Sequence, residues 1–256
     1  MKHHRSGLYS YLFIATAALV LAAQPAPADD LSGATPTDVF NSDFSKGTFD
    51  HLGWESKTHG TGWQILDYQD QKPDLKNSPG PCAVFAATKN TAQELLVRKF
   101  PAVTSPQSLK LTFDGGWGWG QKDQGADVLS VMLLNDEGTG YLFEVHRIKA
   151  KWAAQWAVIT KYAPPPAGKN LNWSPAEIDA TQTAVLDGGG LQTFTISRDE
   201  KGTWSLSGAN WQGATPFEFV DVNHTTNTFS QVALVGAKNF DGLVFNHVHL
   251  QVTQGQ

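Results

Sequence analysis

The sequence has a single cysteine, Cys82, so no disulfide can form within the chain. Its stability must therefore come from packing. Cys82 lies in the apolar segment Cys82-Ala-Val-Phe-Ala-Ala, and no histidine lies near it in the sequence to activate the thiol. We therefore expect Cys82 to be a small buried side chain without a catalytic role.

Basic residues are few as well. Lys and Arg total 19 against 24 Asp and Glu, which gives a formal net charge of -5 at pH 7. Binding to nucleic acid or to anionic lipid depends on Lys and Arg that neutralise phosphate, so this balance argues against both partners. Charged residues make up 17% of the chain and form no long run that would mark a disordered tail. A neutral partner fits this composition better.

The sequence also lacks an apolar run long enough for a comfortable membrane span of about 20 residues. Its longest such run, residues 12–23, follows Lys2 and Arg5 and precedes Ala26-Pro27-Ala28, which is the order of a signal peptide. We expect cleavage after Ala28, with Ala23 as the second choice. The mature chain would then be one domain, residues 29–256, secreted or periplasmic, with 17 basic and 24 acidic residues and a formal charge of -7.

Alternation of apolar and polar residues dominates the rest of the sequence, and no stretch longer than about ten residues keeps a helical apolar stripe. Leu109, Leu111 and Phe113, for example, share one face of a predicted strand. Polar, Gly-containing turns at 135–140 and 198–202 each join two such segments and predict two hairpins.

Antiparallel sheets that each carry one apolar face must stack to bury it. The sequence therefore predicts an all-β protein, an antiparallel β-sandwich of roughly 10–12 strands. Loops on a rigid sandwich are usual places for binding. Long loops are expected over residues 53–62, 70–81, 115–126 and 163–175.

The last predicted strand covers residues 243–252. His247 and His249 share one of its faces, at a spacing that can place two imidazoles on one metal ion, but no third ligand can be identified from the sequence. The alternative is ordinary strand surface. Strict alternation assigns Val244, Val248, Leu250 and Val252 to the core face and Phe245, His247, His249 and Gln251 to the opposite face.

Four segments, 39–45, 140–147, 193–206 and 243–252, resemble strands of the concanavalin A-like lectin and glucanase superfamily. The resemblance covers most of the mature chain and implies a laminin G-like jelly roll. Members of that superfamily bind or cleave polysaccharides on a concave sheet and its rim, and the fold alone does not choose between these roles.

Aromatic side chains are the first binding candidates, because rigid indoles stack on the C–H faces of sugar rings. All nine Trp residues follow residue 28. Trp117 and Trp119 lie in the segment Gly115-Gly116-Trp117-Gly118-Trp119-Gly120, where the glycines leave few side chains to bury two indoles. They are therefore predicted to form a loop platform, with core packing as the alternative. Trp204 alternates with Leu206 and is predicted to lie in the core.

Glu144 and His146 are the catalytic candidates, because they stand two apart on one face of a predicted strand, about 7 Å from each other. A carboxylate beside an imidazole can act as general acid and base, or it can hold sugar hydroxyls. The alternative is a solvated salt bridge. The predicted function is recognition of a neutral polysaccharide or oligosaccharide, with polysaccharide cleavage by elimination or hydrolysis as the alternative.

Sequence patterns of two enzyme families bear on the alternative function, polysaccharide cleavage. The E-x-D-x-x-E strand of laminarinase-type glucanases is absent, which disfavours that retaining chemistry. The order of Gln93-Glu94-Leu95, Glu144-Val145-His146 and residues 229–239 resembles alginate lyases of the same superfamily. Here, however, Gln93 stands near the position of an Arg, Glu144 replaces Gln, and the last segment lacks its Tyr. The residues predicted to contact the ligand are Trp117, Trp119, Arg147, Gln93 and Asn239.

No cofactor is required by these interpretations, but a structural calcium ion fits the chain ends. Asn41 and Asp43 would join Asn246, or Asp241, in an oxygen-rich site if the first and last strands pair. The alternative is that Asn41 and Asp43 cap a turn.

Overall fold

The computed structural model divides the chain into two units, Met1–Gly33 and Ala34–Gln256, and the residues that it describes all belong to the second. The predicted signal peptide therefore lies outside them. The described ranges are 35–56, 62–67, 80–85, 94–116, 128–148, 153–162, 178–185, 191–208, 216–220, 228–236 and 243–254.

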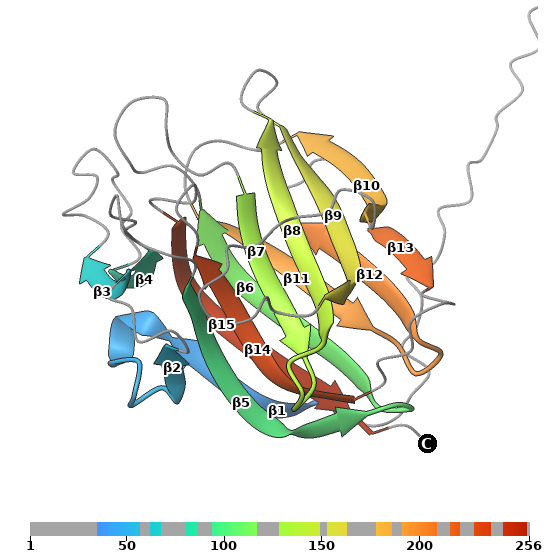
Figure 1. Ribbon diagram of the computed structural model, residues 1–256, viewed down its shortest axis with the longest axis horizontal. Coiled ribbons are helices and arrows are strands. Elements are labelled where there is room, and N and C mark those ends of the chain that lie inside the picture. Colours follow the sequence, from blue (N-terminus) through green and yellow to red (C-terminus); the bar gives the residue numbers. More distant parts are fainter. Residues whose placement is uncertain are drawn as a thin grey trace, which may run out of the picture. The chain divides into compact units, whose positions relative to one another are not determined.

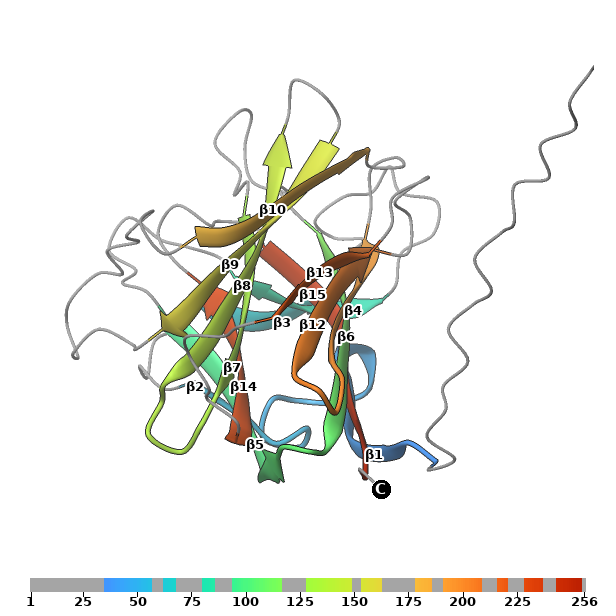
Figure 2. The ribbon, with the colours of Figure 1, turned by 90° about the vertical axis from the view of Figure 1, so that its right-hand side faces the viewer.

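The described residues form two antiparallel sheets (Figures 1 and 2). The eight-stranded sheet has the order β13 (Phe217–Val220), β12 (Thr203–Gly208), β11 (Gln192–Arg198), β6 (Ser108–Gly116), β15 (Leu243–Thr253), β4 (Pro81–Phe85) and β3 (Trp63–Asp67), and β1 (Thr37–Asp43) also pairs with β15. The seven-stranded sheet has the order β10 (Ile178–Val185), β9 (Ala153–Tyr162), β8 (Gly140–Ile148), β7 (Val128–Leu134), β14 (Thr228–Gly236), β5 (Glu94–Thr104) and β2 (Trp54–Ser56). A short 3-10 helix, η1 (Phe44–Lys46), follows β1.

The predicted all-β antiparallel sandwich is confirmed, but the described residues contain fifteen strands, more than the ten to twelve predicted. The two shortest strands explain part of the difference. β2 has three residues and lies within the segment 53–62 that was expected to be a loop, and β13 has four residues. Segments this short carry too few alternations to be recognised from a pattern of period two.

Both predicted hairpins are confirmed. β7 and β8 pair around a turn in which the Thr139 amide donates to Asn135 Oδ1 at 2.9 Å, and Gly138 has a φ of +78° that favours glycine. β11 and β12 pair around a turn in which Asp199 Oδ1 accepts from two backbone amides, Lys201 at 2.9 Å and Thr203 at 2.7 Å. Local polar contacts of this kind define where each strand ends.

The main core lies between the sheets and is rich in aromatic rings. Trp204 of β12 is fully buried, as predicted. Its ring centroid lies 4.9 Å from that of Tyr141, 5.2 Å from that of Phe143 and 5.8 Å from that of Phe229. These three rings belong to strands of the seven-stranded sheet, so Trp204 contributes directly to holding the two sheets together.

For the first residues of β15, the predicted assignment of side chains to the core face and the opposite face is wrong. Phe245 lies in the main core, whereas Val244 packs with Cys82 and Val84 in a separate cluster. The cause is an irregularity in the pairing of β15 with β6 between Phe245 and His247. An extra residue in one strand moves the residues before it to the opposite face.

Candidate functional site

Glu144 and His146 lie on β8 of the seven-stranded sheet, on the face away from the main core. The β7–β8 register places Ser130 directly opposite Glu144 and Val128 opposite His146. His146 Nε2 lies 2.8 Å from Glu144 Oε2, and the Ser130 hydroxyl donates to Glu144 Oε1 at 3.4 Å. The structure therefore brings the two predicted catalytic residues into direct contact and adds Ser130, which the sequence analysis did not single out.

The two side chains differ in their access to solvent. The Glu144 side chain is 6% exposed, and the His146 side chain is 39% exposed. When the Glu144 carboxylate is ionised it can only accept a hydrogen bond, so the tautomer that satisfies this contact carries its proton on His146 Nε2 and leaves the Nδ1 lone pair for other partners. In this arrangement Glu144 orients the imidazole, and His146 is the group able to meet a ligand as hydrogen-bond acceptor or as base.

The face that carries this pair also buries apolar side chains. Leu142 of β8 is on it and belongs to a second buried cluster with Val97, Met132, Leu134, Ala233 and Val235. The seven-stranded sheet therefore has buried apolar residues on both faces. Glu144, Ser130 and His146 are polar side chains beside this apolar cluster, and Gln231 of β14 is a further buried polar residue on the same face.

His146 lies at the end of the sandwich from which several of the predicted ligand-binding segments depart. β7 begins at Val128, directly opposite His146, and β14 ends at Gly236, which pairs with Glu94 at the start of β5. In the other sheet, β6 ends at Gly116, and its Gly115 lies against Leu129 of β7. The strand ends that flank residues 86–93, 117–127 and 237–242 are thus at this end.

The predicted ligand-binding side chains themselves are not described. Gln93, Trp117, Trp119 and Asn239 lie outside the described residues. Arg147 belongs to β8, next to His146, but only its backbone is described. Their role in binding stays a prediction.

Glu94 is a buried carboxylate that the sequence analysis did not identify as important. Both of its carboxylate oxygens lie 3.1 Å from the backbone nitrogen of Gly62, and the residue is 3% exposed. Position 62 has no room for a side chain, because a Cβ there would lie 2.5 Å from Cε2 of Phe85. Glu94 begins β5 and Gly62 precedes β3, so this contact ties one sheet to the other at the end where His146 lies.

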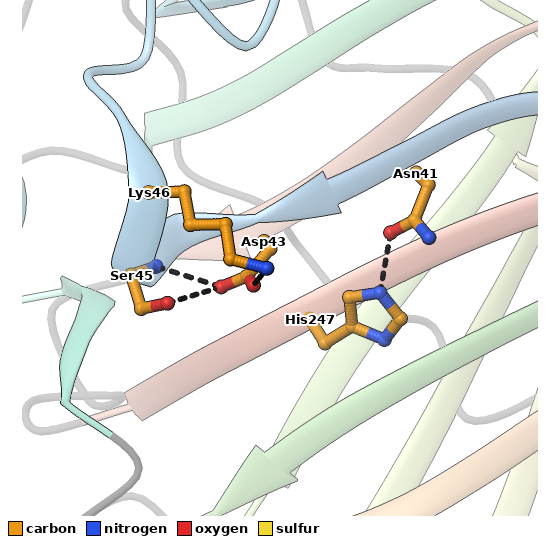
Figure 3. Close-up of polar contacts among 5 residues, drawn as sticks. All are labelled: Asn41, Asp43, Ser45, Lys46 and His247. Carbon is orange, nitrogen blue, oxygen red and sulfur yellow. Dashed lines mark hydrogen bonds and ion pairs between the residues drawn. The ribbon is translucent and has the colours of Figure 1, made fainter.

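The three residues predicted to bind calcium make other contacts, and Figure 3 shows those of Asn41 and Asp43. The Asp43 carboxylate accepts from the Ser45 amide at 3.0 Å and from Lys46 Nζ at 2.8 Å, so it caps η1. Asn41 Oδ1 contacts His247 Nε2, and Asn246 Oδ1 accepts from the Cys82 thiol at 3.6 Å. The first and last strands do pair, as the calcium hypothesis required. The calcium ion itself stays a prediction.

Cys82 is buried, as expected, and its environment leads to a chemical prediction. Burial, with smaller contributions from the negative charges of Asp67, Asp43 and Asp114, raises the pKa of the thiol to about 12. The thiolate is the reactive form, so at pH 8 the folded protein should leave Cys82 unmodified by iodoacetamide while denatured protein is alkylated fully. Mass spectrometry measures both; equal alkylation of folded and denatured protein would contradict the burial.

No protein-family model matches the sequence, and no curated protein matches it. Solved structures do match. An endo-1,3-beta-glucanase from Streptomyces sioyaensis is similar with a TM-score of 0.53 at 12% identity, over 91% of this chain and 100% of that chain. The carbohydrate recognition domain of Emp47p gives 0.51 at 11% identity, over 86% and 97%. Winged bean acidic lectin, complexed with methyl-alpha-D-galactose, gives 0.51 at 8% identity, over 87% and 100%.

The protein therefore has the fold of the concanavalin A-like lectins and glucanases, which confirms the resemblance found in the sequence. At these identities the similarity shows the fold and carries no residue roles. In addition, no helix among the described residues is long and apolar enough to cross a membrane.

Proposed function

We propose that this protein is an exported carbohydrate-binding protein whose site lies at the end of the sandwich where His146 reaches solvent. The contact between Glu144 and His146 carries the proposal, because it holds an accessible imidazole in one orientation by a buried carboxylate. Sugar hydroxyls both donate and accept hydrogen bonds, so an oriented ring nitrogen can select one of them. The fold, shared with lectins and a glucanase, supports the same class of ligand.

The proposed ligand is a neutral polysaccharide or oligosaccharide. The chain has a formal net charge of -5, and removal of the proposed signal peptide would make it -7, so an acidic polymer would be repelled at long range. Trp117 and Trp119 would supply stacking contacts, because the strand ends that flank residues 117–127 lie at the His146 end of the sandwich.

Replacing Trp117 and Trp119 together by alanine should weaken binding by about 2–3 kcal/mol, roughly 30- to 150-fold in Kd, if each indole contributes as a stacked aromatic. Pull-down on a panel of insoluble polysaccharides finds the ligand, and calorimetry with a soluble fragment measures the affinity. The matched control is the double phenylalanine variant, which should keep most of the affinity because it keeps two aromatic faces. Unchanged affinity in a folded double alanine variant would show that the indoles are not the platform.

Polysaccharide cleavage is the second candidate, and the oriented, partly exposed His146 favours it specifically. In an elimination, neutral His146 would remove the proton alpha to a uronate carboxylate, the glycosidic C–O bond beta to that carboxylate would break as the C=C bond forms, and the departing sugar oxygen would take up a proton from the imidazolium or from water. Gln93, Lys238 and Asn239 are the residues we would test for stabilising the developing enolate. Hydrolysis of the laminarinase type is disfavoured by the missing E-x-D-x-x-E strand. The products separate the two reactions, since elimination leaves an unsaturated end that absorbs in the near ultraviolet and hydrolysis leaves only a reducing end.

A further inference from the structure

His247 and His249 lie on the outward face of the eight-stranded sheet, where β15 runs between β1 and β6. They stand two apart on β15, and their ring centroids are 6.0 Å from each other. The Glu144–His146 site belongs to the other sheet, so this pair is separate from the proposed carbohydrate site. Two imidazoles side by side on an accessible strand can ligate one metal ion if a further donor is near.

β1 supplies the oxygen donors that could not be identified from the sequence. His249 Nε2 lies 2.8 Å from Asp38 Oδ1, and His247 Nε2 contacts Asn41 Oδ1 (Figure 3). Asp38 Oδ1 also accepts from Gln251 Nε2 at 3.0 Å. Both ring nitrogens are therefore directed at side-chain oxygens of the same neighbouring strand. Asp38 is separated from the two histidines by more than 200 positions, and only the pairing of β1 with β15 brings them together.

Charges around the pair favour a cation. Asp43 on β1 and Asp114 on β6 are the residues directly opposite His247 on its two neighbouring strands. Lys46 neutralises part of this charge through its contact with Asp43.

We propose that His247, His249 and the Asp38 carboxylate bind one divalent transition-metal ion, with Cu²⁺ bound more tightly than Zn²⁺. Two imidazole nitrogens and one carboxylate oxygen suit both ions, and the general order of affinities places Cu²⁺ above Zn²⁺. No group of three or more His, Cys, Asp or Glu in the described ranges is already arranged to hold a metal. The site therefore assembles on binding: each neutral ring moves its proton from Nε2 to Nδ1, and the exposed Asp38 side chain turns to share the ion.

Titration calorimetry of the full chain with CuCl₂ and with ZnCl₂ at pH 7.5 tests the proposal. We expect one equivalent of each ion at this site, with Kd raised about 10-fold or more in His247→Gln and in His249→Gln, and by a smaller factor in Asp38→Asn. His51→Gln is the matched control for an exposed histidine elsewhere. The double variant His3→Gln, His4→Gln removes the adjacent histidines near the N-terminus. It should still bind one equivalent of each metal ion with unchanged Kd.

Paramagnetic resonance of the Cu²⁺ complex provides an independent measurement. The wild-type spectrum should show coupling to two imidazole nitrogens, and each histidine variant should lose one of them. If His247→Gln or His249→Gln does not fold by circular dichroism, Asp38→Asn and the wild-type nitrogen count still decide the question. The proposal is wrong if neither histidine substitution changes the affinity, if the equivalent disappears with His3 and His4, or if Ca²⁺ binds here as tightly as Zn²⁺.

Discussion

Replacement of Trp204 by alanine is expected to lower the free energy of unfolding by about 3–5 kcal/mol, the range for removing a buried aromatic side chain. Trp204 is fully buried and packs against Tyr141, Phe143 and Phe229 of the opposite sheet. Its loss would leave a cavity where the two sheets meet. Urea unfolding measures the effect as a lower midpoint with an unchanged slope.

Two further variants define the specificity of that effect. Trp204→Phe should cost less than the alanine variant, because it keeps an aromatic ring in contact with the opposite sheet. Val220→Ala on the adjacent strand β13 should change the stability by less than about 0.5 kcal/mol, because Val220 is 56% exposed. A Trp204→Ala variant as stable as Val220→Ala would contradict the described packing of the core.

Replacement of His146 by alanine is expected to lower polysaccharide cleavage about 100-fold if the imidazole is the acid-base group. If the protein only binds its ligand, the same variant should lose about 1 kcal/mol of binding free energy, the value of one hydrogen bond. Initial rates with the ligand found in the pull-down, recorded as near-ultraviolet absorbance and as reducing ends, distinguish these outcomes.

Variants of His146 and of its neighbours distinguish a residue that transfers the proton from residues that only hold the imidazole in place. Added imidazole should partly restore cleavage in His146→Ala, because the missing base can be supplied from solution. It should not restore Glu144→Gln or Ser130→Ala, in which the ring is present but held less well; these variants should lower kcat more than they change KM. His51→Gln is the control with unchanged rates. Full turnover in His146→Ala would make this residue an ordinary surface side chain and leave binding as the better interpretation.

Much of the candidate site could be anticipated, because Glu144 and His146 belong to one strand. Their common face follows from alternation along β8, which depends on nothing outside the strand. The contact with Ser130 and the burial of Glu144 could not be read in this way, because they depend on the register of β7 beside β8 and on what covers the sheet. Glu94 was missed for the same reason, since its partner Gly62 lies 32 positions away.

The sequence by itself determined the all-β class, the two hairpins and the burial of Trp204. These properties are local. A pattern of period two indicates which side chains share a face, and a polar turn indicates where the chain reverses direction. The tertiary structure alone decided that Phe245 rather than Val244 enters the main core, and that Asp38 meets His249. The physical reason is that bulges and strand pairing arise from hydrogen bonds between distant segments, and one inserted residue reverses the facing of the side chains before it.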